Sequence, residues 1–111
     1  MTLREQQARL VDALVTGAPV PAGFVPDRVA AARQALLAKR CREVARHWPA
    51  LLADPGAQGD FLAWAACRTK TTSAADGLAF ARERGKAGRL SPAAADELRA
   101  AQKRRMRRAG R

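Results

Sequence analysis

The stretch Arg33–Leu52, RQALLAKRCREVARHWPALL, has the clearest structural pattern in this chain. Its apolar residues recur every three or four positions, which is the spacing of one face of an α-helix. Pro49 disfavours helical geometry at the residue before it, so the helix is expected to end near Trp48. Upstream, Pro26 and Asp27 suit a first helical turn. The pattern therefore predicts the longest helix of the molecule, over about residues 26–48.

Capping and stop residues predict further helices on both sides of this stretch. Thr2 and Glu5 form a capping box, and Gly17 would end the helix that they open. Ser91 followed by Pro92 opens the last helix. The other expected helices cover residues 2–16, residues 60–67 and a segment capped within residues 71–76 that ends near Arg84. The expected non-helical segments are a proline-rich connector over residues 18–26, a turn over residues 50–53 and a loop over residues 54–59.

The size and composition of the chain favour one helical domain. Its 111 residues have room for a single hydrophobic core. Hydrophobic residues make up 48% of the chain but aromatic residues only 5%, which is more typical of closely packed helices than of strands. We therefore expect an all-α fold, a compact bundle of about five helices. Residues 1–90 are expected to form a helical core domain, and residues 91–111 a C-terminal basic helix or tail.

The residues that usually carry catalysis or metal binding are scarce. Cys41 and Cys67 belong to no C-x-x-C motif, so we expect two small buried thiols, and His47 is the single histidine. No G-x-S-x-G, H-E-x-x-H or Gly-rich phosphate motif is present. We therefore expect no enzyme activity, no metal and no cofactor. No segment approaches the roughly 18 apolar residues of a membrane span, and the start of the chain lacks a signal-peptide pattern. This predicts a cytoplasmic protein that does not enter a membrane.

The charge of the chain predicts an acidic or polyanionic partner. Its 21 Lys and Arg residues against 10 Asp and Glu give a formal net charge of +11. Basic residues gather on the outer side of the longest predicted helix and in the last part of the chain. These candidates for contact with nucleic acid or an acidic protein are Arg28, Lys39, Arg42, Arg46, Arg104, Arg105, Arg107 and Arg108. The alternative is a solvated helix face and a tail that binds nothing in particular.

A second group of cations lies inside the apolar arc of the same helix. Arg33, Arg40 and His47 are seven positions apart and therefore form one row along the helix. Because a buried arginine without a partner is costly, the row must reach solvent, meet carboxylates or face a cleft whose ligand supplies an anion. The possible internal carboxylates are Asp12, Glu43, Asp60 and Asp76. The apolar arc itself consists of Val29, Leu36, Leu37, Val44 and Trp48, and Phe80 is expected to be buried elsewhere in the core.

Several segments, taken in order, resemble a known family. They are LREQQARL at Leu3–Leu10, the helix that contains Arg33 and Arg40, its end at WPALL (Trp48–Leu52), and DFLAW at Asp60–Trp64 after a glycine-containing loop. This order is similar to the helical N-terminal domain of the partner proteins of multinuclear non-haem iron-dependent oxidative enzymes, and to a compact actinobacterial branch of that family. Its members often carry the label of a DNA-binding domain. The resemblance covers residues 3–84.

The resemblance implies a non-catalytic adaptor in the modification of ribosomally made peptides (RiPP biosynthesis). Such an adaptor docks on the iron enzyme and holds the precursor peptide while its cysteines are oxidised, and the iron ligands belong to the enzyme. Arg33, Arg40 and Trp48 would lie near the peptide groove or in its structural support, and His47 joins them as a candidate for peptide binding. The alternatives are a small basic DNA-binding or regulatory protein and a charged structural protein without a ligand of its own.

Overall fold

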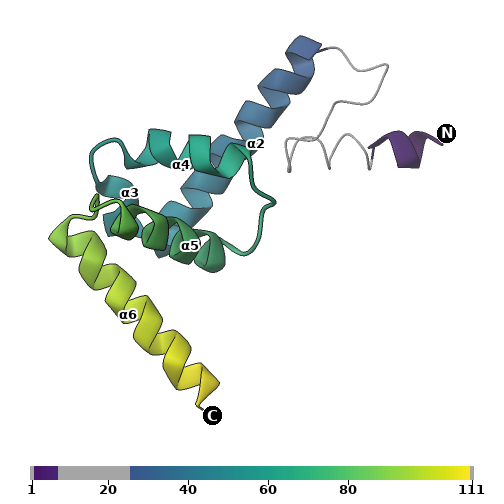
Figure 1. The fold of residues 1–111 in the computed structure, drawn as a ribbon. Coiled ribbons are helices and arrows are strands. Elements are labelled where there is room, and N and C mark those ends of the chain that lie inside the picture. Colours follow the sequence, from purple (N-terminus) through teal and green to yellow (C-terminus); the bar gives the residue numbers. More distant parts are fainter. Residues whose placement is uncertain (1, 8–25, 111) are drawn as a thin grey trace.

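A computed structural model describes residues 2–7 and 26–110 of the chain (Figure 1). Residues 3–7 are helical, and the longer helices are α2 (Pro26–His47), α3 (Pro49–Ala53), α4 (Ala57–Ala66), α5 (Ser73–Lys86) and α6 (Pro92–Ala109). No strand occurs in this part of the chain, so the prediction of an all-helical single domain is confirmed. The connector over residues 18–25 and the rest of the predicted first helix lie outside the described residues. None of the described helices combines the length and the apolar character that crossing a bilayer requires.

Three predicted helix starts are confirmed by their hydrogen bonds. The Glu5 N–H donates to the Thr2 hydroxyl and the Thr2 N–H to the Glu5 carboxylate, both over 3.1 Å, which completes the capping box. Thr72 precedes α5, and its hydroxyl accepts from the backbone N–H three residues on. Ser91 does the same for α6. These caps are local, because donor and acceptor are only three residues apart, and a sequence can therefore reveal them.

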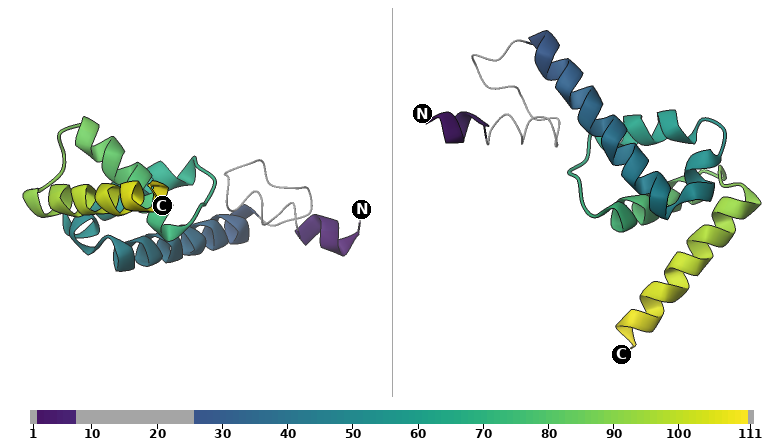
Figure 2. Two further views of the ribbon diagram at one scale, coloured as in Figure 1. Left: turned by 90° about the horizontal axis from the view of Figure 1, so that it is seen from below. Right: turned by 180° about the vertical axis from the view of Figure 1, so that it is seen from behind.

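The core forms where α2 packs against α3, α4 and α5. Figure 2 shows α2 crossing one side of the bundle, with its first turns extending beyond the other helices. The rings of Phe61 and Phe80 meet edge to face with their centroids 5.2 Å apart, so the expected burial of Phe80 is confirmed. The buried core includes Leu37, Cys41, Val44, Trp48, Leu51, Leu52, Phe61, Ala65, Phe80, Ala81 and Ala94.

Two predicted core residues are at the surface. Leu36 is 40% exposed, although Leu37 beside it is buried. Adjacent helix residues point about 100° apart, so Leu36 lies at the edge of the apolar arc while Leu37 faces its centre. Cys41 is buried as predicted, but Cys67 is exposed. Cys67 follows the last residue of α4 as its C-cap, where the packed face of that helix has ended.

The segment between α2 and α4 also differs from the prediction. The expected turn over residues 50–53 is part of helix α3, which begins at Pro49. Glu97 of α6 accepts hydrogen bonds from the N–H groups of Ala50 and Leu51, both over 2.9 Å, and so caps α3 from far along the chain. Helix α4 begins at Ala57, three residues before the predicted start, after Gly56 in the left-handed conformation with φ 74°.

Helix α6 packs against α3 and α5. Ala94 is buried, and Leu98 and Ala101 pack against the core. Residues 103–110 are all exposed, and the last turns of α6 extend away from the bundle (Figure 1). The side of α6 that faces the other helices therefore continues outward as the wall of a surface groove.

Candidate functional site

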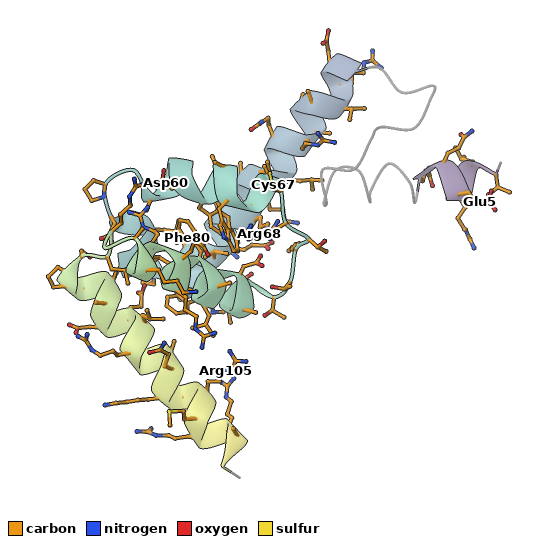
Figure 3. The ribbon with its side chains drawn as sticks, in the orientation of Figure 1. Glu5, Asp60, Cys67, Arg68, Phe80 and Arg105 are labelled. Atoms are coloured by element: carbon orange, nitrogen blue, oxygen red, sulfur yellow. The ribbon has the colours of Figure 1, made fainter. Side chains whose placement is uncertain are left out.

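A surface groove of about 510 Å³ lies where the end of α2, the first turns of α5 and the second half of α6 meet. This volume is within the range of roughly 300–1,000 Å³ that is usual for ligand clefts. Arg105 leaves α6 on the side toward α5 (Figure 3). We call this feature the basic groove; its lining residues are His47, Trp48, Thr72, Ala74, Ala75, Leu78, Ala101, Arg104, Arg105 and Arg108.

One wall of the basic groove is a row of arginines on α6. Arg104 and Arg108 are four positions apart and therefore lie one above the other on the same side of the helix. Arg105 is next to them, and all three are exposed. None of the three has an ion-pair partner among the described residues. The wall thus offers three guanidinium groups, each able to form two parallel hydrogen bonds with a carboxylate or a phosphate.

The opposite wall combines the end of α2 with the start of α5. His47 is the last residue of α2 and is exposed, whereas Trp48 is only 3% exposed. Trp48 packs against Gly77 of α5 so closely that a Cβ atom at residue 77 would overlap its indole ring. This contact fixes the start of α5 against the end of α2. The first turn of α5 carries the positive end of the helix dipole, which adds to the positive potential of the arginines.

The basic groove is suited to binding an anionic group that also carries apolar surface. No acidic side chain is among the described residues that line it. Leu78 and Ala101 add apolar surface to the lining beside the arginines, and we call these two residues the apolar floor. The Thr72 hydroxyl accepts a hydrogen bond from the Ala75 N–H and so acts as the cap of α5. By charge and shape, this lining therefore suits a ligand that is held and oriented and not chemically changed.

The structure distributes the predicted site residues over four places, of which the core holds Arg40 alone. His47 and Trp48, expected to bind a peptide, lie in the basic groove together with Arg104, Arg105 and Arg108, expected to meet an acidic partner. Arg33 is half-buried on α2 and does not line this groove. Exposed positions away from the groove hold the remaining candidates, which are Arg28, Lys39, Arg42 and Arg46 on α2 and Arg107 on α6.

Arg40, named as a candidate for peptide binding, instead meets an internal carboxylate, which is one of the alternatives that the sequence left open: it is 4% exposed and pairs with Asp76. Its Nε donates to Asp76 over 2.8 Å and its Nη2 to the other carboxylate oxygen over 3.2 Å. The guanidinium also donates to the carbonyl group of Ala65 in the last turn of α4 and to those of Arg68 and Thr69 just after it. Arg40 therefore joins α2 and α4 to Asp76 at the start of α5, next to Ala74 and Ala75 of the groove lining.

The environment of Asp76 stabilises its charged form. Burial acts to raise the pKa of this carboxyl, but hydrogen bonds from Arg40 and from the Thr71 hydroxyl, together with the charge of Arg40, outweigh it. The net result is a pKa below the ordinary aspartate value. Glu43, the other proposed partner on α2, pairs instead with Lys70 over 3.2 Å.

Sequence reasoning missed a second buried arginine and the residue that fixes α6. Arg84 is buried, donates to Asp60 over 2.6 Å and to the Arg89 carbonyl over 3.3 Å. Its position four residues after Phe80 puts both on one side of α5, which is a signal that the sequence does contain. Glu97 carried no such signal, because the amides it caps are more than forty positions away in the chain.

Taken together, the fold and the groove define a small, strongly basic, all-helical protein with an arginine-lined surface groove among its described residues. The chain belongs to the family described as "SCO6045-like, C-terminal domain", whose sequence model matches residues 4–86. The comparisons with curated proteins and with solved structures give no match. The matched segment ends with the last residue of α5, so α6 and its arginines lie outside it.

Proposed function

We propose that this protein is a non-catalytic adaptor that binds a multinuclear iron-dependent oxidase together with the precursor peptide that the oxidase modifies. The observation that carries the proposal is the basic groove, in which His47 and Trp48 of the sequence-predicted peptide site meet three arginines of α6. The order of the segments that resemble iron-oxidase partner proteins supports the same function. On this proposal the iron and its ligands belong to the enzyme.

The adaptor needs a rigid site and a separate surface for the enzyme, and the chain has features suited to both. The Arg40–Asp76 pair and the contact between Trp48 and Gly77 hold the groove walls in place. On α2, Arg42 and Arg46 are exposed positions outside the groove that suit contact with an acidic enzyme surface. A peptide in the groove and an enzyme on α2 would therefore not compete for the same side chains.

A DNA-binding role is the second candidate, and the exposed end of α6 is the observation that favours it. Residues 103–108 include Lys103, Arg104, Arg105, Arg107 and Arg108, all exposed. Such a segment binds phosphates through the release of counterions, so its affinity falls steeply as salt rises. Truncation after Arg99 would remove most of that affinity. Binding of the adaptor to its enzyme would persist at higher salt.

The test is purification of the tagged full chain from its native lysate with nuclease at about 0.3 M salt, where phosphate-driven binding is weak. We expect a co-purified protein that contains iron by elemental analysis, together with a Cys-containing peptide found by mass spectrometry. Recovery of neither, combined with recovery of nucleic acid at low salt without nuclease, would replace the adaptor proposal with the DNA-binding one.

A further inference from the structure

The arginine wall of the basic groove has a fixed spacing. Arg104 and Arg108 lie on one side of α6, one helical turn apart, which is about 6 Å along the helix axis. Arg105 points toward α5 from the same helix and also lines the groove. A ligand that uses Arg104 and Arg108 together must therefore present two negative groups with a similar separation.

The three arginines also repel one another in the unliganded protein. Like charges four positions apart destabilise a helix, and the described residues offer these arginines no carboxylate. Elsewhere in the molecule Arg40 and Arg84 do have carboxylate partners, Asp76 and Asp60. The charge in the groove is therefore left for an external anion to neutralise.

The floor of the groove distinguishes a peptide from a nucleic acid. Leu78 and Ala101 give the groove aliphatic surface, whereas Trp48 is only 3% exposed and so offers no open aromatic face on which a base could stack. A peptide can put an apolar side chain on this floor while its acidic side chains reach the arginines. Two carboxylates reach a separation of about 6–7 Å at positions i and i+2 of an extended chain or at i and i+4 of a helix.

We infer that the basic groove binds an acidic peptide segment with two Asp or Glu residues at one of these spacings, their carboxylates on Arg104 and Arg108 and an apolar residue on the floor. The inference rests on the proposed function only in assigning the segment to the precursor peptide. His47 also lines the groove and can donate a further hydrogen bond to the same peptide segment. Because α6 lies outside the family match, this preference belongs to α6 of this chain.

The chain offers a matched pair of variants to test the inference. Arg104→Gln with Arg108→Gln removes two charges at the groove. Lys103→Gln with Arg107→Gln removes two charges with the same spacing from exposed positions of the same helix that do not line the groove. Both double variants have the same net charge. A difference in peptide affinity between them therefore results from where the charges were removed and not from the total charge. Circular dichroism confirms that both retain their helix content.

The measurement is fluorescence anisotropy of a dye-labelled peptide with an Asp-Leu-Asp repeat, titrated with the full chain at about 0.15 M salt. We expect binding that weakens about tenfold or more in the groove variant and less than about threefold in the control variant. The Asn-Leu-Asn peptide should not bind. Equal losses in the two variants, or tighter binding of a labelled single-stranded DNA of similar length, would overturn the inference.

The two proposals fail in different ways. If the acidic peptide binds as expected but no iron-containing protein co-purifies from the lysate, the groove assignment holds and the adaptor function is wrong. If the iron-containing protein and its peptide co-purify equally well with the groove variant, the adaptor function holds and the groove assignment is wrong.

Discussion

Gly77 is the residue whose identity the groove depends on most directly. The indole of Trp48 occupies the space where any Cβ at this position would lie, and because the ring is buried it cannot move aside. We expect Gly77→Ala to destabilise the protein by about 1–2 kcal/mol, since overpacking outweighs the better helix propensity of alanine. The measurement is the free energy of unfolding in urea.

Gly59 of α4 is the matched control for this substitution. A Cβ there meets no atom within 4 Å. Gly59→Ala should therefore stabilise the protein by about 0.5–1 kcal/mol through the smaller entropy loss of alanine. If Gly77→Ala were stabilising to the same extent, the close contact between Trp48 and α5 would be wrong.

The buried pair of Arg40 and Asp76 predicts a specific dependence on pH. Asp76→Asn leaves Arg40 buried without its counter-charge, which should cost about 3–5 kcal/mol at neutral pH. The folded-state pKa of Asp76 lies below its unfolded value of about 3.9. Its ionised form therefore adds to the free energy of unfolding above about pH 3.9, and this stabilisation is lost as the pH falls through the folded-state pKa. The difference in the free energy of unfolding between wild type and Asp76→Asn, measured in urea, should therefore become smaller at acidic pH.

Asp96 provides the control for this pair. It forms an ion pair with Arg99 on the exposed side of α6, where solvent screens the charges. Asp96→Asn should change the free energy of unfolding by less than about 1 kcal/mol at any pH. A similar small effect for Asp76→Asn would contradict the buried network.

The two cysteines should differ in reactivity. Cys67 is exposed at the end of α4, whereas Cys41 lies in the core, and burial raises the pKa of its thiol more than the nearby Arg42 lowers it. We expect an aromatic disulfide reagent to modify one thiol rapidly in the native protein and the second only after denaturation. Peptide mapping should identify the rapid site as Cys67; rapid modification of Cys41 would contradict its burial.

Helices α3 and α6 hold each other through reciprocal caps. Glu97 of α6 accepts from two amides of α3, and Asp54, directly after α3, accepts from the Ser91 N–H over 3.0 Å. Pro49 has no N–H, so the Glu97 carboxylate meets the first free amides of α3. We expect these caps to help set the direction in which α6 leaves the bundle, and hence the width of the basic groove.

Removal of one cap should therefore affect both stability and binding. We expect Glu97→Ala to cost about 1–2 kcal/mol and to weaken binding of the acidic peptide, although Glu97 does not line the groove. The measurements are urea unfolding and peptide anisotropy. Glu83→Ala, at an exposed position of α5, is the control. It should change neither the free energy of unfolding nor the affinity for the acidic peptide beyond experimental error. Unchanged peptide binding in Glu97→Ala would show that α6 does not need this cap.

The sequence predicts those helices whose start signals are local. Thr72 and Ser91 mark α5 and α6 because each caps an amide three residues away. The cap of α3 cannot be read in this way, since Glu97 comes close to it only through the tertiary fold. The same limit applies to Arg33, Arg40 and His47, the row of cations on α2. Periodicity placed Arg40 and His47 on one side of the helix, but only packing buries Arg40 against Asp76 and leaves His47 exposed.

In the molecule as a whole, the excess of positive charge is organised in two ways. The two buried arginines among the described residues have carboxylate partners: Arg40 pairs with the buried Asp76 and Arg84 with the half-exposed Asp60. The arginines of α6 extend beyond the bundle, and those that line the groove have no acidic neighbour in the described part of the chain. The net charge of +11 predicts attraction to anions in general. On our inference, the shape of the groove and its apolar floor select among these anions.

The decisive experiment compares co-purification from the native lysate by wild type, the Arg104→Gln/Arg108→Gln variant and the Lys103→Gln/Arg107→Gln variant, with nuclease and at about 0.3 M salt. We predict that wild type and the second variant recover an iron-containing oxidase with its precursor peptide, and that the first variant recovers the oxidase with much less peptide. Recovery of no iron-containing protein by any of the three, with nucleic acid bound once nuclease is omitted at low salt, would contradict the adaptor function.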